Sequence, residues 1–122
     1  MTDDFFSETS IRSVRKPRPC EGCGHPVEKG SPAAKCVGRN IDGFWSGIYH
    51  RDCRDAEVKL NTYRDYRWGD DFMALSAMEL DDWPMLLEEF PDVAIRFGIT
   101  QERYDEAMES RQRVYEAWKA RT

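Results

Sequence analysis

Long hydrophobic runs are absent from this sequence: none of its 122 residues falls in a stretch of about 18 consecutive apolar residues. We therefore expect no membrane-spanning helix. The first ten residues are acidic and have neither a basic start nor a long apolar core, so we expect no secretory signal peptide. These absences predict a cytoplasmic protein, or one that also enters the nucleus if its source has one.

Groups that usually carry out catalysis are also scarce. The only histidines are His25 and His50. No glycine-rich phosphate loop occurs, and no serine lies in a nucleophile elbow. General acid–base catalysis would therefore lack its commonest side chain. We predict that the protein is not an enzyme.

Three of the four cysteines and one of the histidines form the most informative pattern. Cys20 and Cys23 are separated by two residues, as are His50 and Cys53, and 26 residues lie between the pairs. Two such pairs supply the four ligands of a tetrahedral zinc ion, and four protein ligands leave no open position for catalysis. Without an export signal, cysteines favour a metal over disulfides, although disulfide-paired or unliganded thiols stay as alternatives. We predict one structural Zn²⁺.

Two further residues compete for the ligand positions. Cys36 lies in a predicted strand and would be the substitute for His50, and His25 follows the first cysteine pair by two residues. A strand cysteine beside a small residue such as Ala34 is more typical of a buried core position. We expect His25 to cap or pack on the first cysteine pair.

Local signals around the ligands predict a knuckle, a hairpin and a helix over residues 20–67. Pro19, Gly22 and Gly24 favour a tight turn at the first pair. Strands over 33–39 and 44–49 flank Asp42-Gly43, a dipeptide typical of hairpin turns. A helix then begins near His50, because apolar residues recur with helical spacing after it.

This order of elements resembles a treble-clef zinc finger, and the ligand order Cys, Cys, His, Cys with Tyr49 before His50 is similar to the zinc fingers of poly(ADP-ribose) polymerases. The resemblance covers residues 18–66 only, and the loop between the pairs is slightly shorter than in that family. It implies that the lobe recognises DNA ends. The basic residues would then contact phosphates: Arg15, Lys16, Arg18, Lys35, Arg39, Arg51 and Arg54.

The charge distribution agrees with a division into parts. Residues 1–11 carry a net charge of −3, residues 12–67 carry +5 and residues 68–122 carry −7, which sum to the total of −5. We predict a flexible basic N-terminal arm over 1–19, a zinc lobe over 20–67 and an acidic helical lobe over 68–122. The fold class is therefore α+β, a treble-clef lobe followed by an all-helical lobe.

Helix boundaries in the last lobe follow from capping signals. We expect a helix from Phe72 to Leu80 capped by Asp70 or Asp71, a restart at Pro84 and a break at Pro91. Gly98 ends a short helix, and Thr100 caps the longest one. On that helix Tyr104, Ala107, Met108, Arg111, Val114, Tyr115 and Trp118 share one face, which we expect to pack on Leu60, Leu86, Leu87 and Phe97.

The segment 92–108 matches a helix-turn-helix pattern, but its second helix has the wrong charge for reading DNA. Glu102, Asp105, Glu106 and Glu109 would face the phosphates and be repelled. We therefore expect the basic zinc lobe to bind nucleic acid instead, with DNA as the expected partner and regulation as the expected role. The alternative is a protein-interaction adaptor or inhibitor whose zinc is purely structural and whose acidic, aromatic helical lobe docks a protein partner. No small-molecule substrate is expected.

Overall fold

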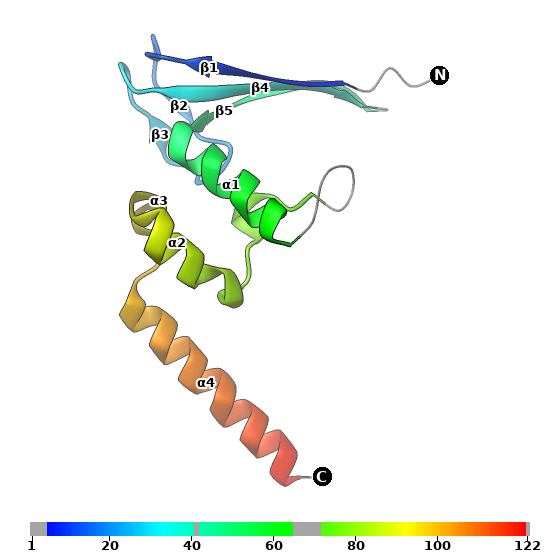
Figure 1. Cartoon of the computed structure of the whole chain (residues 1–122), viewed down its shortest axis with the longest axis vertical. Coiled ribbons are helices and arrows are strands. Elements are labelled where there is room, and N and C mark those ends of the chain that lie inside the picture. The colour runs from blue at the N-terminus through cyan, green and yellow to red at the C-terminus, as the bar shows by residue number, and fades with distance from the viewer. Residues whose placement is uncertain (1–4, 41, 65–71, 122) are drawn as a thin grey trace. The chain divides into compact units, whose positions relative to one another are not determined.

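The computed structural model describes residues 5–40, 42–64 and 72–121. It shows a mixed α and β chain with a small sheet and a helical C-terminal region (Figure 1). The chain divides into two compact units, Met1–Ala77 and Met78–Thr122. The first unit therefore ends at Ala77, ten residues beyond the boundary at 67 that the charge distribution suggested, and residues 72–77 belong to it.

The first unit is built on a three-stranded antiparallel sheet of order β1-β4-β5. β4 (Ala33–Asn40) and β5 (Gly43–His50) form the hairpin that Asp42-Gly43 predicted, in register from Ala33 opposite His50 to Asn40 opposite Gly43. Gly43 has a φ of 118°, a conformation that favours glycine at the turn. The predicted hairpin is confirmed.

The prediction of a flexible arm over residues 1–19 differs from the structure. Phe5–Ile11 form β1, which pairs along its whole length with β4. Beyond it, Val14 is buried, its N–H donates to the Ser31 carbonyl at 3.0 Å, and its carbonyl accepts from Gly30 at 2.8 Å. Arg18–Pro19 then form β2, which pairs with β3 (Pro26–Val27). Residues 5–19 are thus held by hydrogen bonds to segments that are distant in the sequence. Local sequence patterns do not reveal such pairings.

Helix α1 (Arg51–Tyr63) lies against one face of the sheet (Figure 1). It begins after His50, as its helical spacing predicted, and buries Cys53, Ala56 and Leu60. These side chains form the core of the first unit with residues from the strands and from the segment after the helix: Val27, Ala34, Cys36 and Leu75.

The helix predicted from Phe72 to Leu80 is wrong. The chain instead makes two short 3₁₀ turns, Leu75–Ala77 and Leu80–Asp82, and the proposed caps Asp70 and Asp71 lie outside the described residues. The reason is that side chains of α1 satisfy the backbone here. Asn61 accepts from the Met73 N–H at 2.6 Å and donates to the Met73 carbonyl at 2.9 Å, while Glu57 accepts from the Leu75 N–H at 3.1 Å. Because these backbone groups already have hydrogen-bond partners, the segment does not have to form a helix to satisfy them.

The second unit contains α2 (Trp83–Glu89), α3 (Pro91–Arg96) and α4 (Gln101–Ala120). The predicted helix boundaries are confirmed. Pro84 and Pro91 lie in the first turns of α2 and α3, and Gly98, after α3, has a φ of 70°. The Thr100 hydroxyl caps α4 by accepting from the Arg103 N–H at 3.1 Å. Buried Leu86, Val93, Ala94 and Ile99 form the core of this unit.

Helix α4 does not use its apolar face as predicted. None of its residues is buried, and Trp118 is 61% exposed. The spacing placed these side chains on one face correctly, but the described chain covers that face only in part, at Tyr104, Ala107 and Met108. No helix in the described part of the chain combines the length and hydropathy needed to cross a bilayer.

Candidate metal centre and basic surface

The first ligand pair lies in a knuckle held by the β2–β3 hairpin. The Cys20 N–H donates to the His25 carbonyl at 2.9 Å, and the Gly24 N–H donates to the Cys20 carbonyl at 2.8 Å. Gly24 has a φ of 79°, so the turn needs a residue without a side chain here. The Glu21 N–H donates to the Ile48 carbonyl at 2.8 Å and fixes the knuckle against β5.

The second pair lies where β5 ends and α1 begins. His50 is the last residue of β5 and the N-cap residue of α1, and Cys53 is buried in the first helical turn. The His50 backbone N–H donates to the Cys20 sulfur at 3.3 Å, as does the Gly22 N–H. Backbone N–H groups from both ligand pairs therefore donate to the same sulfur atom, that of Cys20.

The four predicted ligands come together in a group that could hold one metal ion. One donor atom from each of Cys20, Cys23, His50 and Cys53 lies within 4.8 Å of the others. His50 Nδ1 lies 3.3 Å from Cys23 Sγ and 3.7 Å from Cys53 Sγ. A tetrahedral zinc ion, with bonds of about 2.3 Å to sulfur and about 2.0 Å to nitrogen, separates such atoms by about 3.5 Å. Three soft thiols and one imidazole also suit zinc chemically.

The opposite ring nitrogen of His50 sets its tautomer. Nε2 lies 3.0 Å from the Pro26 carbonyl oxygen. A carbonyl only accepts, so Nε2 carries the proton and Nδ1 keeps its lone pair for the metal. Pro26 belongs to β3, so the hairpin that holds the knuckle also orients the third ligand.

Local electrostatics favour a thiolate at Cys20. A hydrogen bond from the Cys53 thiol lowers the pKa of Cys20, against the opposing effect of burial, and backbone N–H donors lower it further. For Cys23 burial dominates and raises the pKa. A bound cation would stabilise the thiolate form of each ligand.

Cys36 and His25 lie outside this group. Cys36 is 1% exposed on the face of β4 that meets α1, and its Sγ lies 4.0 Å from Glu8 Oε1. Burial raises the pKa of the Cys36 thiol to about 11, so it stays protonated. The His25 side chain is exposed, whereas its backbone supports the knuckle: its carbonyl accepts from the Cys20 N–H, and its backbone also hydrogen-bonds Cys23.

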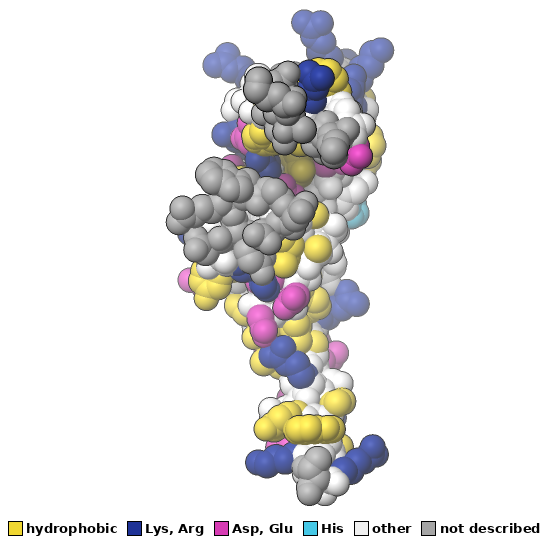
Figure 2. Space-filling model, turned by 90° about the vertical axis from the view of Figure 1, so that its right-hand side faces the viewer, with side chains coloured by type: hydrophobic (Ala, Val, Ile, Leu, Met, Phe, Trp, Pro, Cys, Tyr) yellow, Lys and Arg dark blue, Asp and Glu magenta, His cyan; other side chains and the backbone are white. Residues whose placement is uncertain are grey.

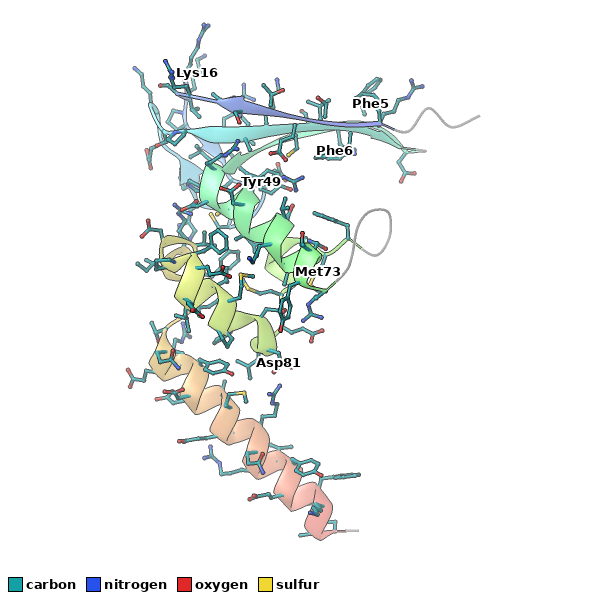
Figure 3. All side chains as sticks on the ribbon, in the orientation of Figure 1. Phe5, Phe6, Lys16, Tyr49, Met73 and Asp81 are labelled. Atoms are coloured by element: carbon teal, nitrogen blue, oxygen red, sulfur yellow. The ribbon has the colours of Figure 1, made fainter. Side chains whose placement is uncertain are left out.

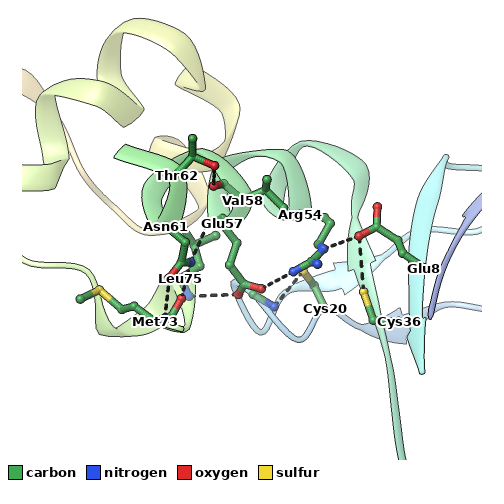
Figure 4. Close-up of polar contacts among 11 residues, drawn as sticks. Glu8, Cys20, Cys36, Arg54, Glu57, Val58, Asn61, Thr62, Met73 and Leu75 are labelled. Atoms are coloured by element: carbon green, nitrogen blue, oxygen red, sulfur yellow. Dashed lines mark hydrogen bonds and ion pairs between the residues drawn. The ribbon is translucent and has the colours of Figure 1, made fainter. Parts of the chain in front are cut away.

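The residues predicted to contact phosphates do not form one surface. Arg54 is 7% exposed, and its guanidinium donates to Glu8 Oε1 at 2.6 Å and to Glu57 Oε1 at 2.8 Å (Figure 4). It also lies over the rings of Phe6, Tyr49 and Phe72, at 5.2 to 5.7 Å from their centroids. This burial removes Arg54 from the surface that phosphates could reach. Its spacing to Glu57 is visible in the sequence, but Glu8 is a partner that only the fold supplies.

Arg51 lies apart from the hairpin cations. Its guanidinium donates to the Ser10 hydroxyl of β1 and lies 3.9 Å from the Asp55 carboxylate. Arg15 and Lys16 are exposed in the connection between β1 and β2. Because the side chains of Arg51, Arg15 and Lys16 are accessible to solvent, they are able to make the predicted phosphate contacts.

Two of the remaining cations, Lys35 and Arg39, lie on the face of the three-stranded sheet that is turned away from α1, whereas Arg18 lies in β2. Alternation along β4 places Lys35 and Arg39 together on this outer face, because residues four apart in a strand point the same way. Phe5 and Phe44 are the direct cross-strand neighbours of Arg39. Figure 3 shows Phe5 on the outer face, with Phe6 and Tyr49 on the face toward α1.

Exposed aromatic rings on the outer face were not predicted from the sequence. Phe5 is 45% and Phe44 is 70% exposed; their rings meet edge to face at 5.8 Å. The Arg39 guanidinium lies 5.2 Å from the centre of the Phe44 ring. The sequence did contain a sign of this contact: pairing the two strands across the Asp42-Gly43 turn places Arg39 directly opposite Phe44. Lys35 also lines a pocket of about 130 Å³ with Arg18, Glu21, Ser46 and other β5 residues.

Comparison with family models, curated proteins and solved structures gives no significant match for this chain. Its function must therefore be argued from the metal centre and the surfaces of the two units.

Proposed function

We propose that the chain is a small zinc-finger protein of the treble-clef type that binds nucleic acid through the outer face of its sheet. Zinc serves the fold, because four protein ligands close the coordination shell and leave no position for a substrate or water. The ion joins the knuckle to the β5–α1 junction, and so fixes both the sheet and the helix behind it.

One observation carries the proposal: Arg39 lies between Phe5 and Phe44, two phenylalanines that are exposed on the outer sheet face of the described residues. Aromatic rings on which bases stack, combined with cations that meet phosphates, are the features of single-strand binding surfaces. Lys35 follows on the same face, about 13 Å along the strand at the usual rise per residue. Arg18 lines the same pocket as Lys35 and adds positive charge, partly offset by Glu21 in that pocket. Arg15, Lys16 and Arg51 would extend the contacts to phosphates.

The helical unit has no part in this binding. Between Gln101 and Ser110, α4 has four carboxylates and one arginine. Phosphates at close range would be repelled by such a surface. The turn between α3 and α4 therefore serves helix packing rather than insertion of α4 into a DNA groove.

Fluorescence anisotropy with labelled single-stranded and duplex oligonucleotides, over a series of salt concentrations, tests the proposal. Replacing Lys35 and Arg39 with Ala together should weaken binding and reduce the slope of log K against log salt by about 1.4 to 1.8, since two phosphate contacts are lost. Phe44→Ala should cost about 1–3 kcal/mol of single-strand affinity through lost stacking and leave the salt slope unchanged.

Lys59→Ala is the matched control, because it removes one positive charge from the side of α1 that does not face the sheet. It should leave affinity and salt slope close to those of the parent protein. Equal binding by the Lys35/Arg39 double variant and the control, or no binding at low salt by the parent, would contradict the proposal.

The second candidate function is a protein-interaction adaptor, favoured by the exposed Val114, Tyr115 and Trp118 of α4. The two functions share the structural metal and differ in the surface that is essential. Substitutions on the outer sheet face would impair the first function only, and substitutions on α4 would impair the second only.

A further inference from the structure

A small pocket opens at the edge of the sheet where β5 lies next to β2. Its volume is about 130 Å³, and Arg18, Glu21, Lys35 and Ser46 are among the residues that line it. For comparison, a protein cavity of about 150 Å³ holds one benzene-sized ring. The pocket therefore has room for one small planar group or one phosphate, but not for a larger ligand.

The position of Glu21 at this pocket is fixed by β5. The Glu21 N–H donates to the Ile48 carbonyl at 2.8 Å, which anchors the residue beside the strand. Gly47 also lines the pocket and leaves open the space that the Glu21 side chain occupies. A Cβ at residue 47 would lie 2.4 Å from Glu21 Cγ and 3.1 Å from Glu21 Oε1. The carboxylate therefore lies against the β5 backbone.

The lining of the pocket combines hydrogen-bond donors with acceptors. The Arg18 and Lys35 side chains only donate, the Glu21 carboxylate only accepts, and the Ser46 hydroxyl can do either. Within the described residues no ion pair joins Glu21 to Arg18 or Lys35. The charged groups are therefore not already satisfied by one another, and a ligand with both kinds of hydrogen-bonding group would suit them.

This combination of groups favours a nucleobase over a phosphate. A carboxylate in so small a pocket would repel a phosphate at close range. The edge of a base, in contrast, presents donors and acceptors side by side. Guanine matches best, because its O6 accepts from arginine or lysine, and its N1–H and N2–H are adjacent donors that the two oxygens of one carboxylate can accept. Adenine, cytosine and thymine lack two adjacent nitrogens that both donate.

We propose that this pocket selects guanine within the single strand that the outer face binds, an inference that rests on the proposed function. Glu21 accepts from guanine N1–H and N2–H, and Arg18 donates to O6. Ser46 lies two residues from Phe44 on the same face of β5, about 7 Å at the usual rise per residue. A neighbouring base can therefore stack on the Phe44 ring. Lys and Arg side chains that project from the sheet end of the chain (Figure 2) meet the flanking phosphates.

Competition against a labelled thymidine hexanucleotide, with the zinc-loaded full chain, tests this selection. The competitors are unlabelled thymidine hexanucleotides that carry one guanine, hypoxanthine, adenine or cytosine. The guanine strand should bind at least about fivefold more tightly than the others. Hypoxanthine retains O6 and N1–H but lacks the N2 amino group, so it should lose most of this preference. Equal binding of all strands would overturn the guanine pocket alone, whereas no binding of any strand would overturn the proposed function and the pocket with it.

Three variants test the role of the carboxylate. Glu21→Gln should remove most of the guanine preference, because an amide has only one acceptor oxygen, and should bind the thymidine strand at least as tightly as the parent. Gly47→Ala should have the same effect, because the added methyl group displaces the Glu21 side chain. Glu28→Gln is the matched control at an exposed residue beyond β3, and it should keep the parent preference.

Zinc content by elemental analysis shows whether the knuckle of each variant is intact. A guanine preference that survives both Glu21→Gln and Gly47→Ala would overturn the assignment of Glu21. Tighter binding of every strand by Glu21→Gln, with no change in base preference, would overturn the selection of guanine and show that the pocket holds a phosphate.

Discussion

His50 Nε2 lies 3.0 Å from the Pro26 carbonyl oxygen, while Nδ1 of the same ring lies 3.3 Å from Cys23 Sγ. One nitrogen is committed as a donor to the backbone, and the other therefore faces the thiols as a ligand. A hairpin of two-residue strands thus controls which atom of His50 is available to a metal ion. The candidate metal centre therefore depends on this contact as well as on its four possible ligands.

The first prediction concerns the ligand set. Co²⁺ in place of zinc should give the visible absorption spectrum of a tetrahedral site with three sulfurs and one nitrogen, because Nδ1 of His50 completes the shell. His50→Cys should shift this spectrum to that of a four-sulfur site while one metal ion stays bound. A spectrum of the parent protein with four sulfurs would instead indicate that Cys36 replaces His50.

The second prediction concerns the dependence of the first unit on zinc. Binding to three thiolates and an imidazole contributes on the order of 10 kcal/mol, more than a lobe of this size gains from its own core. Chelation of the metal, Cys23→Ser or Cys53→Ala should therefore unfold residues 20–67, seen as loss of amide dispersion by NMR. Cys36→Ala is the control and should retain one zinc ion per chain by elemental analysis.

The third prediction concerns the reactivity of Cys36. Burial raises its thiol pKa to about 11. At pH 8 only about one molecule in a thousand would carry the thiolate, which is the form that reacts with alkylating agents. In the zinc-loaded protein, Cys36 should stay unmodified by iodoacetamide in mass spectrometry, whereas unfolding in denaturant should make it react. Rapid alkylation of the folded protein at Cys36 would contradict its placement in the core.

Signals that lie close together in the chain predicted more than signals that depend on the fold. The ligand pairs, the Asp42-Gly43 turn and the Thr100 cap each act within a few residues, so the sequence shows them directly. β1 could not be predicted in this way, because its partner β4 follows more than 20 residues later. Arg54 lies 46 residues from Glu8, and the sequence therefore presented a buried ion pair as a surface cation. For α4 the spacing identified one face but not whether anything covers it.

The fourth prediction compares two glycines on the sheet face toward α1. A side chain at Gly38 would collide with the Trp45 indole, and one at Gly47 would collide with the Glu21 side chain. The bulky indole packs against the sheet, whereas the Glu21 carboxylate can move into solvent. Gly38→Ala should lower the free energy of unfolding by about 1–3 kcal/mol. Gly47→Ala should change it by less than about 1 kcal/mol, and equal effects in urea denaturation would contradict the distinction.

The last prediction concerns the ion pairs beneath the sheet. Arg54 and Glu57 have side-chain exposures of 8% and 3%, and Glu8 completes the group at 30%. Arg54→Met should therefore lower the free energy of unfolding by about 3–5 kcal/mol, because Glu57 would be left charged and unpaired in the core. Adding Glu57→Gln removes that charge and keeps an acceptor for the Leu75 N–H, so the double variant should recover much of the loss.

Denaturant unfolding of the zinc-loaded variants, with metal content matched, measures this coupling. Arg51→Ala is the control, since Arg51 is 42% exposed and its contact with Asp55 at 3.9 Å contributes little. A double variant no more stable than Arg54→Met alone would show that Arg54 acts through its three aromatic neighbours instead of its carboxylates. Nucleic-acid affinity of the folded double variant should match the parent, because a buried guanidinium does not meet phosphates.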